Sequence, residues 1–315
     1  MKRQTVLVTG ANGFVGRCLV QMLETQGYVV RRAVRTGAVL ENEIAVGSIG
    51  PTTNWETAVA GVDAVVHLAA RVHHPNEEHA EELYRQINAE GTLQLARTAS
   101  HANVRRFIFL SSILVNGSCT DQRGPFSEND RFLPRGVYGQ SKAAAELSLQ
   151  ELAGNSQMSV SIVRPPLVYG REAGANFRQL AAAIKMGVPL PFGLLNNRRA
   201  FIGVQNLASF ISRLIDFEQR IACKTYLVAD AEQISLAAFI RRMGHAMNRP
   251  AILLPVPIRL LDFAVRTFRP TLRDSLIGSL EIDTSSALSI GWHAPLDMDE
   301  SLELALGPRT EIRDR

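Results

Sequence analysis

Two patterns of hydrophobic residues alternate through the first half of the chain. Short apolar runs rich in Val, Ile and Phe have the length of buried strands, and stretches with helical spacing separate them. Strands are expected at 6–9, 29–34, 44–46, 64–69, 107–111 and 160–164. Helices are expected at 17–23, 57–60 and 77–101, and from 138 onward. This alternation predicts an α/β fold, a doubly wound parallel sheet with helices on both faces.

The rhythm changes after residue 170. Helices are expected at 176–185, 207–217 and 236–247, a strand at 225–228 and an extended, proline-punctuated piece at 250–257. The pattern divides the chain into a first domain, 1–170, and a smaller mixed lobe, 171–315, whose segments are free to interleave with the first.

A further helix at 258–268 has a strongly apolar side. It carries Leu260, Leu261, Phe263, Ala264 and Phe268. We expect this side to pack on the core or on a second copy of the chain. Contact with a membrane surface is the alternative.

Composition narrows the class of protein. The 315 residues exceed the ~100–200 of a typical single domain. The net charge is only +4 and basic residues form isolated pairs, so nucleic-acid binding is not expected. Cys18, Cys119 and Cys223 are far apart and form no C-x-x-C, which disfavours a disulfide framework or a metal site.

Neither a secretory leader nor a membrane span is expected. The chain enters its first strand without the apolar core of a signal peptide, and no apolar run approaches the ~18 residues of a spanning helix. We therefore expect a cytoplasmic protein with no integral membrane segment.

A glycine loop follows the first strand. Gly10, Gly13 and Gly16 stand three residues apart, and the next helix begins among them. A strand that turns through glycines into a helix N-terminus directs unpaired N–H groups and the positive dipole end at one point, where a pyrophosphate can bind. The alternative is a glycine-rich turn without a ligand.

A tyrosine and a lysine lie four residues apart at the start of the fourth expected helix. This spacing puts Tyr138 and Lys142 on one face. An ammonium group stabilises a phenolate, so we expect a lowered pKa for Tyr138 and proton exchange with a hydroxyl or ketone. Ser111 and Ser112 end the fifth strand, where a hydroxyl can hold the same substrate oxygen. A Tyr–Lys pair alone also occurs on many exposed helices.

Six motifs in order carry a family resemblance. They are TGANGFVG at 9–16, HLAA at 67–70, NAEG at 88–91, LSS at 110–112, YGQSK at 138–142 and RPPLVYG at 164–170. Together they resemble an extended short-chain dehydrogenase/reductase of the nucleotide-sugar epimerase/dehydratase group. The resemblance implies a Rossmann domain that binds NAD or NADP, and a C-terminal lobe that closes over a UDP- or dTDP-sugar.

The resemblance assigns roles to individual residues. Tyr138 would be the proton donor, Lys142 would bind the nicotinamide ribose, Ser112 would be the catalytic serine, and Asn88 would brace the active-site strand. The residues expected to hold the cofactor are Gly10, Asn12, Gly13, Phe14, Val15, Gly16, Arg35, Leu68, Ala69, Ala70, Tyr138, Lys142 and Pro165. Those expected to hold the substrate are Ser111, Ser112, Asn176, Arg199 and Arg273, the last three on its diphosphate.

Two departures from the family pattern bear on the cofactor. The second strand ends in Arg31-Arg32-Ala33-Val34-Arg35, where the family usually has an acidic residue for the ribose hydroxyls. Arginine suits a 2′-phosphate, so NAD(P) is expected, with NADP favoured. The family's Gly-Asp after the third strand is Gly47-Ser48 here, which removes a common adenine contact. The alternative is that the arginines only form a solvated strand end and do not recognise a cofactor.

The resemblance implies one of three reactions on this scaffold: 4-epimerisation, 4,6-dehydration or reduction of a 4-keto group. Dehydration requires an Asp-Glu pair after the catalytic serine, and this chain has Ile113-Leu114. After the serine, the epimerase-like members of the family usually have Val-Tyr-Gly, and this chain has Val115-Asn116-Gly117. In this feature it resembles a bacterial subgroup of enzymes tied to O-antigen sugar synthesis. That subgroup reduces UDP-4-keto-6-deoxy-N-acetylglucosamine to UDP-N-acetylquinovosamine, which is our leading hypothesis.

A UDP-hexose 4-epimerase is the alternative. A catalytically silent dinucleotide sensor is a third hypothesis, which the intact Ser112, Tyr138 and Lys142 oppose. The family also implies a homodimer through the long helices at 77–101 and 138–153.

Overall fold

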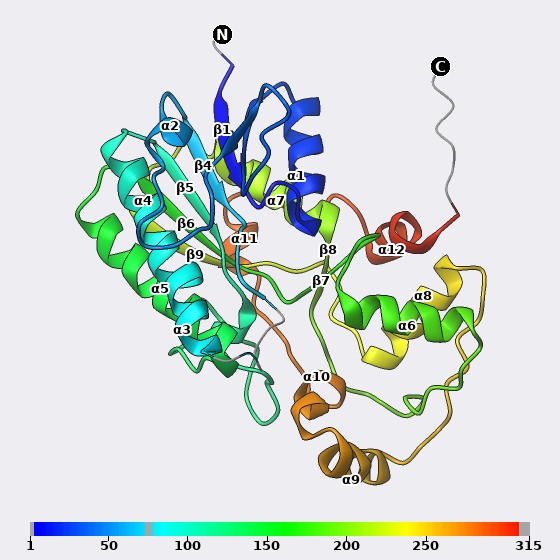
Figure 1. Cartoon of the computed structure of the whole chain (residues 1–315). Helices are drawn as coiled ribbons and strands as arrows, with labels where there is room; N and C mark the ends of the chain where they lie inside the picture. Colours follow the sequence, from blue (N-terminus) through cyan, green and yellow to red (C-terminus); the bar gives the residue numbers. More distant parts are fainter. Residues whose placement is uncertain (1–2, 73–76, 78, 309–315) are drawn as a thin grey trace.

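A computed structural model of the chain describes residues 3–72, 77 and 79–308 (Figure 1). Its centre is a seven-stranded parallel sheet with the order β3-β2-β1-β4-β5-β6-β9. The strands are β1(Thr5–Thr9), β2(Val29–Val34), β3(Glu43–Ala45), β4(Ala64–His67), β5(Arg106–Leu110), β6(Ser159–Arg164) and β9(Cys223–Leu227). The strand order reverses between β1 and β4, and a crevice for a ligand forms beyond the carboxyl ends of strands at such a point.

Helices cover both faces of this sheet (Figure 1). Side chains of β1 alternate between two cores, because successive residues of a strand point to opposite faces. Val6 and Val8 pack with α1(Phe14–Thr25) and α7(Val204–Asp216). Leu7 packs with α2(Glu56–Val59), α4(Gly91–His101) and α5(Gly136–Gly154). The doubly wound Rossmann fold predicted from the sequence is confirmed.

The single helix expected at 77–101 is interrupted. It consists of α3(Ala80–Tyr84), a six-residue π-helical stretch η1(Arg85–Glu90), and α4. Buried Asn88 lies in the π-helical stretch. Such insertions often occur at functional sites.

The second half builds a lobe and also returns to the large sheet. A two-stranded sheet, β7(Leu167–Tyr169) and β8(Phe201–Gly203), packs with α6(Ala175–Lys185), α8(Leu236–Ala246) and α12(Met298–Leu306) around a stacked pair, Phe201 and Phe239, whose ring centroids are 4.1 Å apart. α7 and β9 return to the Rossmann layers, so the second half of the chain also contributes to the large sheet and to the helices that cover it. The short elements are η2(Ile113–Val115), η3(Pro270–Leu272), α10(Arg273–Leu276) and α11(Ser285–Leu288).

The amphipathic helix α9(Ile258–Phe268) has the bounds expected from the sequence. Its expected packing on the core is wrong for most of the apolar side, because Leu261 is buried but Leu260, Phe263 and Phe268 are 59%, 68% and 78% exposed. In the described residues, no helix combines the length and apolarity that crossing a membrane requires.

Candidate active site

The glycine loop is packed too tightly for side chains. Gly10 has a φ of +68°, and a β-carbon there would lie 2.8 Å from the amide nitrogen of Ala69. A β-carbon on Gly16 would lie 2.1 Å from the carbonyl oxygen of Gly10. Gly13 is the N-cap of α1 and has no side chain with which to cap it, so N–H groups of the first turn remain available to an anion.

A buried chain of hydrogen bonds connects the start of α4 to the backbone that packs against this loop. The Thr92 hydroxyl donates to the carbonyl oxygen of Asn88 at 2.7 Å, so it accepts from His67 Nε2 at 3.0 Å. The His67 Nδ1 atom then accepts from the Thr9 hydroxyl at 2.7 Å, and Thr9 accepts from the Ala69 amide at 3.2 Å. Burial lowers the pKa of His67 to about 3, which keeps the imidazole neutral. This support for the Gly10–Ala69 contact was not predicted from the sequence.

A cleft runs past the loop along the carboxyl ends of the strands. Its two adjoining parts enclose about 660 and 720 Å³, the size of small-molecule sites. Both parts contain Gly10, Gly13 and Ala69. Every expected cofactor residue lines the cleft except Pro165, which is buried and accepts a hydrogen bond from the Ile113 amide at 3.0 Å.

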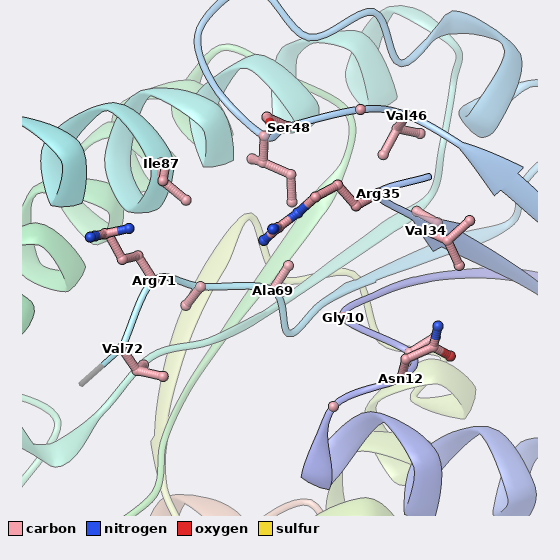
Figure 2. Close-up of a pocket in the computed structure, with 16 residues that line it drawn as sticks. Gly10, Asn12, Val34, Arg35, Val46, Ser48, Ala69, Arg71, Val72 and Ile87 are labelled. Carbon is pink, nitrogen blue, oxygen red and sulfur yellow. The ribbon is translucent and has the colours of Figure 1, made fainter. Parts of the chain in front are cut away.

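The structure separates the three arginines around the end of β2. Arg31 donates to the carbonyl oxygens of Ala58 and Ala60, both at 2.8 Å, and Arg32 pairs with Glu24 at 2.6 Å. Arg35 is exposed, and Figure 2 shows its guanidinium in the cleft between Ser48 and Ala69. Of the three, Arg35 is placed to meet a ligand.

Tyr138 and Lys142 lie in the first turns of α5, at the other end of the cleft. The Lys142 ammonium is buried, donates to the Leu110 carbonyl oxygen at 2.8 Å, and lies 5.9 Å from the centroid of the Tyr138 ring. Burial lowers the pKa of Lys142 to about 7. Burial, with a smaller effect of Tyr84, raises the pKa of Tyr138 to about 12. The expected lowering of the Tyr138 pKa is wrong, since burial outweighs an ammonium directed at a carbonyl.

The two adjacent serines point in different directions. Ser112 is partly exposed and caps η2, its Oγ accepting from the Leu114 amide at 3.2 Å. The Leu114 carbonyl oxygen would lie 3.0 Å from a β-carbon on Gly139, so η2 packs against the first turn of α5 beside Tyr138. Ser111 is only 3% exposed and donates to Glu146. Its expected contact with substrate is therefore not supported by its position.

A buried charge pair lies behind these groups. Arg164 Nε lies 3.0 and 3.1 Å from the two carboxylate oxygens of Glu146, and both residues are 0% exposed. Arg164 also donates to Asn116 Oδ1 at 2.8 Å, and Asn116 donates to the Ser127 carbonyl oxygen at 2.9 Å. No role for Glu146 was predicted from the sequence, although Glu146 lies one helical turn beyond Lys142.

Residues 6–229 match the model of the NAD dependent epimerase/dehydratase family. The chain belongs to this family. A UDP-glucose 4-epimerase from Vibrio cholerae is 37% identical over 308 residues, covering 95% of this chain and 94% of that protein. Membership makes the chain an NAD(P)-dependent enzyme of the nucleotide-sugar epimerase/dehydratase type.

Solved structures confirm the fold of this family member. MoeE5 in complex with UDP-glucuronic acid and NAD has a TM-score of 0.75 at 24% identity, covering 96% of this chain and 97% of that chain. The UDP-N-acetylglucosamine 4-epimerase from Methanobrevibacter ruminantium M1, in complex with UDP-N-acetylmuramic acid, has a TM-score of 0.77 at 21% identity, covering 97% and 98%.

In this epimerase/dehydratase-family chain, the residues expected at the substrate diphosphate fall into two places. Asn176 is exposed in the first turn of α6 and lines the cleft with Tyr138. Arg199 is 9% exposed and donates to the carbonyl oxygens of Asp274 and Gly278, at 2.8 and 2.6 Å. Arg273 pairs with Asp262 at 2.8 Å. Both arginines therefore lie at α10, and neither belongs to the described lining of the cleft.

Proposed function

We propose that this chain is a nucleotide-sugar 4-ketoreductase that converts UDP-4-keto-6-deoxy-N-acetylglucosamine to UDP-N-acetylquinovosamine with NADPH. The observation that carries the proposal is Arg35, whose guanidinium lies in the part of the cleft beside Val34 and Ser48. A guanidinium is the side chain best suited to a 2′-phosphate. A reductase consumes its cofactor in every cycle, whereas an epimerase regenerates it.

The residues of the cleft fit a dinucleotide. Gly10 and Gly16 leave room only for backbone, and the N–H groups at the start of α1 suit a pyrophosphate. Lys142 and Tyr138 would hold the nicotinamide ribose at the far end. When bound, the nicotinamide exchanges a hydride with the sugar.

The proton chemistry belongs to the chain. The raised pKa of Tyr138 keeps its phenol protonated at neutral pH, and reduction of a ketone requires that form. Ser112 Oγ accepts from the Leu114 amide, which leaves its own O–H free to donate to the C4 oxygen. Tyr138 would then deliver its proton to the same oxygen as the alcohol forms.

The residues that follow Ser112 do not support dehydration. Ile113 and Leu114 form the turn after Ser112, and neither side chain can remove a proton. The Val115-Asn116-Gly117 turn supports the reductase through its resemblance to the O-antigen subgroup. The Asn116 side chain is buried against Arg164, so it shapes this turn rather than touching the sugar.

A UDP-hexose 4-epimerase is the second candidate, favoured by the 37% identity to the UDP-glucose 4-epimerase of Vibrio cholerae. In either case we propose a cytoplasmic homodimer that supplies sugars for O-antigen. The exposed Leu147 on α5 supports packing of that helix against a second copy.

One assay distinguishes the candidates. The protein is mixed with NADPH or NADH and UDP-4-keto-6-deoxy-N-acetylglucosamine, and separately with UDP-glucose or UDP-N-acetylglucosamine. Stoichiometric cofactor oxidation with the keto sugar alone supports the reductase. Interconversion of gluco and galacto products without net oxidation contradicts it and identifies the epimerase. Cofactor binding without turnover of any of these sugars favours the sensor.

A further inference from the structure

The described residues leave an apolar surface uncovered at the tip of the lobe. We define the α9 surface as the exposed side chains of Ile258, Leu260, Phe263, Phe268 and Leu272. Two large aromatic rings with 68% and 78% exposure on one short helix are unusual, because phenylalanine is normally buried. In Figure 1, α9 projects at the bottom of the lobe, remote from the sheet that carries the cofactor cleft.

The helix has two apolar sides. Leu261 and Val265 are four residues apart and pack into the lobe core. Leu260, Phe263 and Ala264 follow i, i+3, i+4 spacing on a different side. The packed side holds α9 to the lobe, so the outer side is fixed in position and ready to bury against a partner.

Positive charge flanks the exposed rings. The segment from Ile258 to Arg273 contains four arginines and a single acidic residue, Asp262. Arg259 lies four residues before Phe263, and Arg266 lies three after it, so both flank this ring on the helix surface. Asp262 is already neutralised by Arg266 at 2.7 Å and Arg273 at 2.8 Å. Arg259 and Arg269 are exposed and add net positive charge.

We propose that the α9 surface docks on the anionic face of a lipid bilayer. The helix lies in the plane of the interface, with Leu260, Phe263 and Phe268 among the acyl chains and the arginines at the lipid phosphates. Large apolar side chains next to arginines are the signature of an interfacial helix. A second copy suits the surface less well, because a two-fold interface would set one net positive patch against another.

The test is sedimentation of the full chain with vesicles. Phosphatidylcholine vesicles with 30% phosphatidylglycerol, on the order of physiological anionic content, are compared with phosphatidylcholine alone. We expect binding to the anionic vesicles that weakens as salt rises. The variant L260S/F263S/F268S should bind at least about tenfold more weakly, and R259E/R269E should lose the preference for anionic lipid.

A matched control uses exposed apolar residues of other elements. The variant V39S/M186S/L304S removes side chains that are 86%, 73% and 48% exposed and should bind as the wild type does. Equal binding of all variants, or no binding of the wild type, overturns the proposal. A change from dimer to monomer in L260S/F263S/F268S by light scattering also overturns it, because a second copy would then cover the surface. Melting temperatures confirm that the variants fold, and none of these outcomes depends on the reaction catalysed.

Discussion

The Glu146 carboxylate and the Arg164 guanidinium form a fully buried ion pair one helical turn beyond Lys142. Glu146 follows Lys142 by four residues, hence one turn of α5, and Arg164 ends β6. The pair therefore couples the helix that carries Tyr138 to the sheet, and through Asn116 to the turn after Ser112. A buried pair holds its partners in one geometry, because either charge alone would be left unsolvated.

Glu146→Gln should destabilise the fold by about 3–5 kcal/mol, since it leaves the Arg164 charge buried without its partner. Denaturant unfolding measures the loss. The double variant E146L/R164M should recover part of it, because it removes both charges at once. If the double variant loses as much stability as Glu146→Gln or more, the two charges are not coupled.

Activity should depend on pH through Lys142. Burial lowers its pKa to about 7, so the ammonium loses its proton as pH rises through neutrality. Because kcat/KM for the cofactor reports the free enzyme, it should fall about tenfold per pH unit above the pKa of Lys142. A profile that stays flat to about pH 10, the ordinary lysine range, would contradict an essential Lys142 ammonium.

Tyr138→Phe should lower kcat by about 10²–10⁴, the usual contribution of a general acid. Cofactor affinity should stay near the wild-type value, since the ring is retained. Tyr28→Phe is the matched control, because its hydroxyl bonds Asp216, outside the cleft. Full activity of Tyr138→Phe would show that another group delivers the proton.

Arg35→Ala should raise the KM for NADPH at least about tenfold, or 1.4 kcal/mol, and leave the KM for NADH nearly unchanged. Arg32→Ala is the control, because Arg32 pairs with Glu24 rather than facing the ligand. Steady-state kinetics of each variant with NADPH and with NADH measures these KM values. An equal effect of Arg35→Ala on the two cofactors counts against recognition of a 2′-phosphate.

Gly16→Ala should abolish cofactor binding, measured by fluorescence titration, because its β-carbon would collide with the Gly10 carbonyl and displace the loop. Gly50→Ala should bind normally, since no atom of the described residues lies within 4 Å of its β-carbon position. Normal binding by Gly16→Ala would mean that the loop tolerates a shift without losing the pyrophosphate site.

Features that depend on neighbours along the chain could be predicted from the order of the residues alone. Periodicity predicted the seven strands of the large sheet and α9, because buried faces repeat every two residues in a strand and every three to four in a helix. It did not predict the short strands β7 and β8. The glycine loop and the Tyr138–Lys142 pair were equally readable, since each acts within one turn or one loop. Motif order along the chain then identified the family.

Which of several similar side chains faces the cleft depends on the tertiary fold. Ser111 and Ser112 are adjacent, yet Ser111 donates to Glu146 of α5, whereas Ser112 caps the turn η2 that packs against the first turn of α5. Arg31 and Arg32 are held by α2 and α1, and Arg35 faces the cleft. The outer side of α9 reads like any core-facing stripe until the neighbouring elements are in place. These outcomes depend on partners distant in sequence, and local pattern carries no information about which partner a side chain will find.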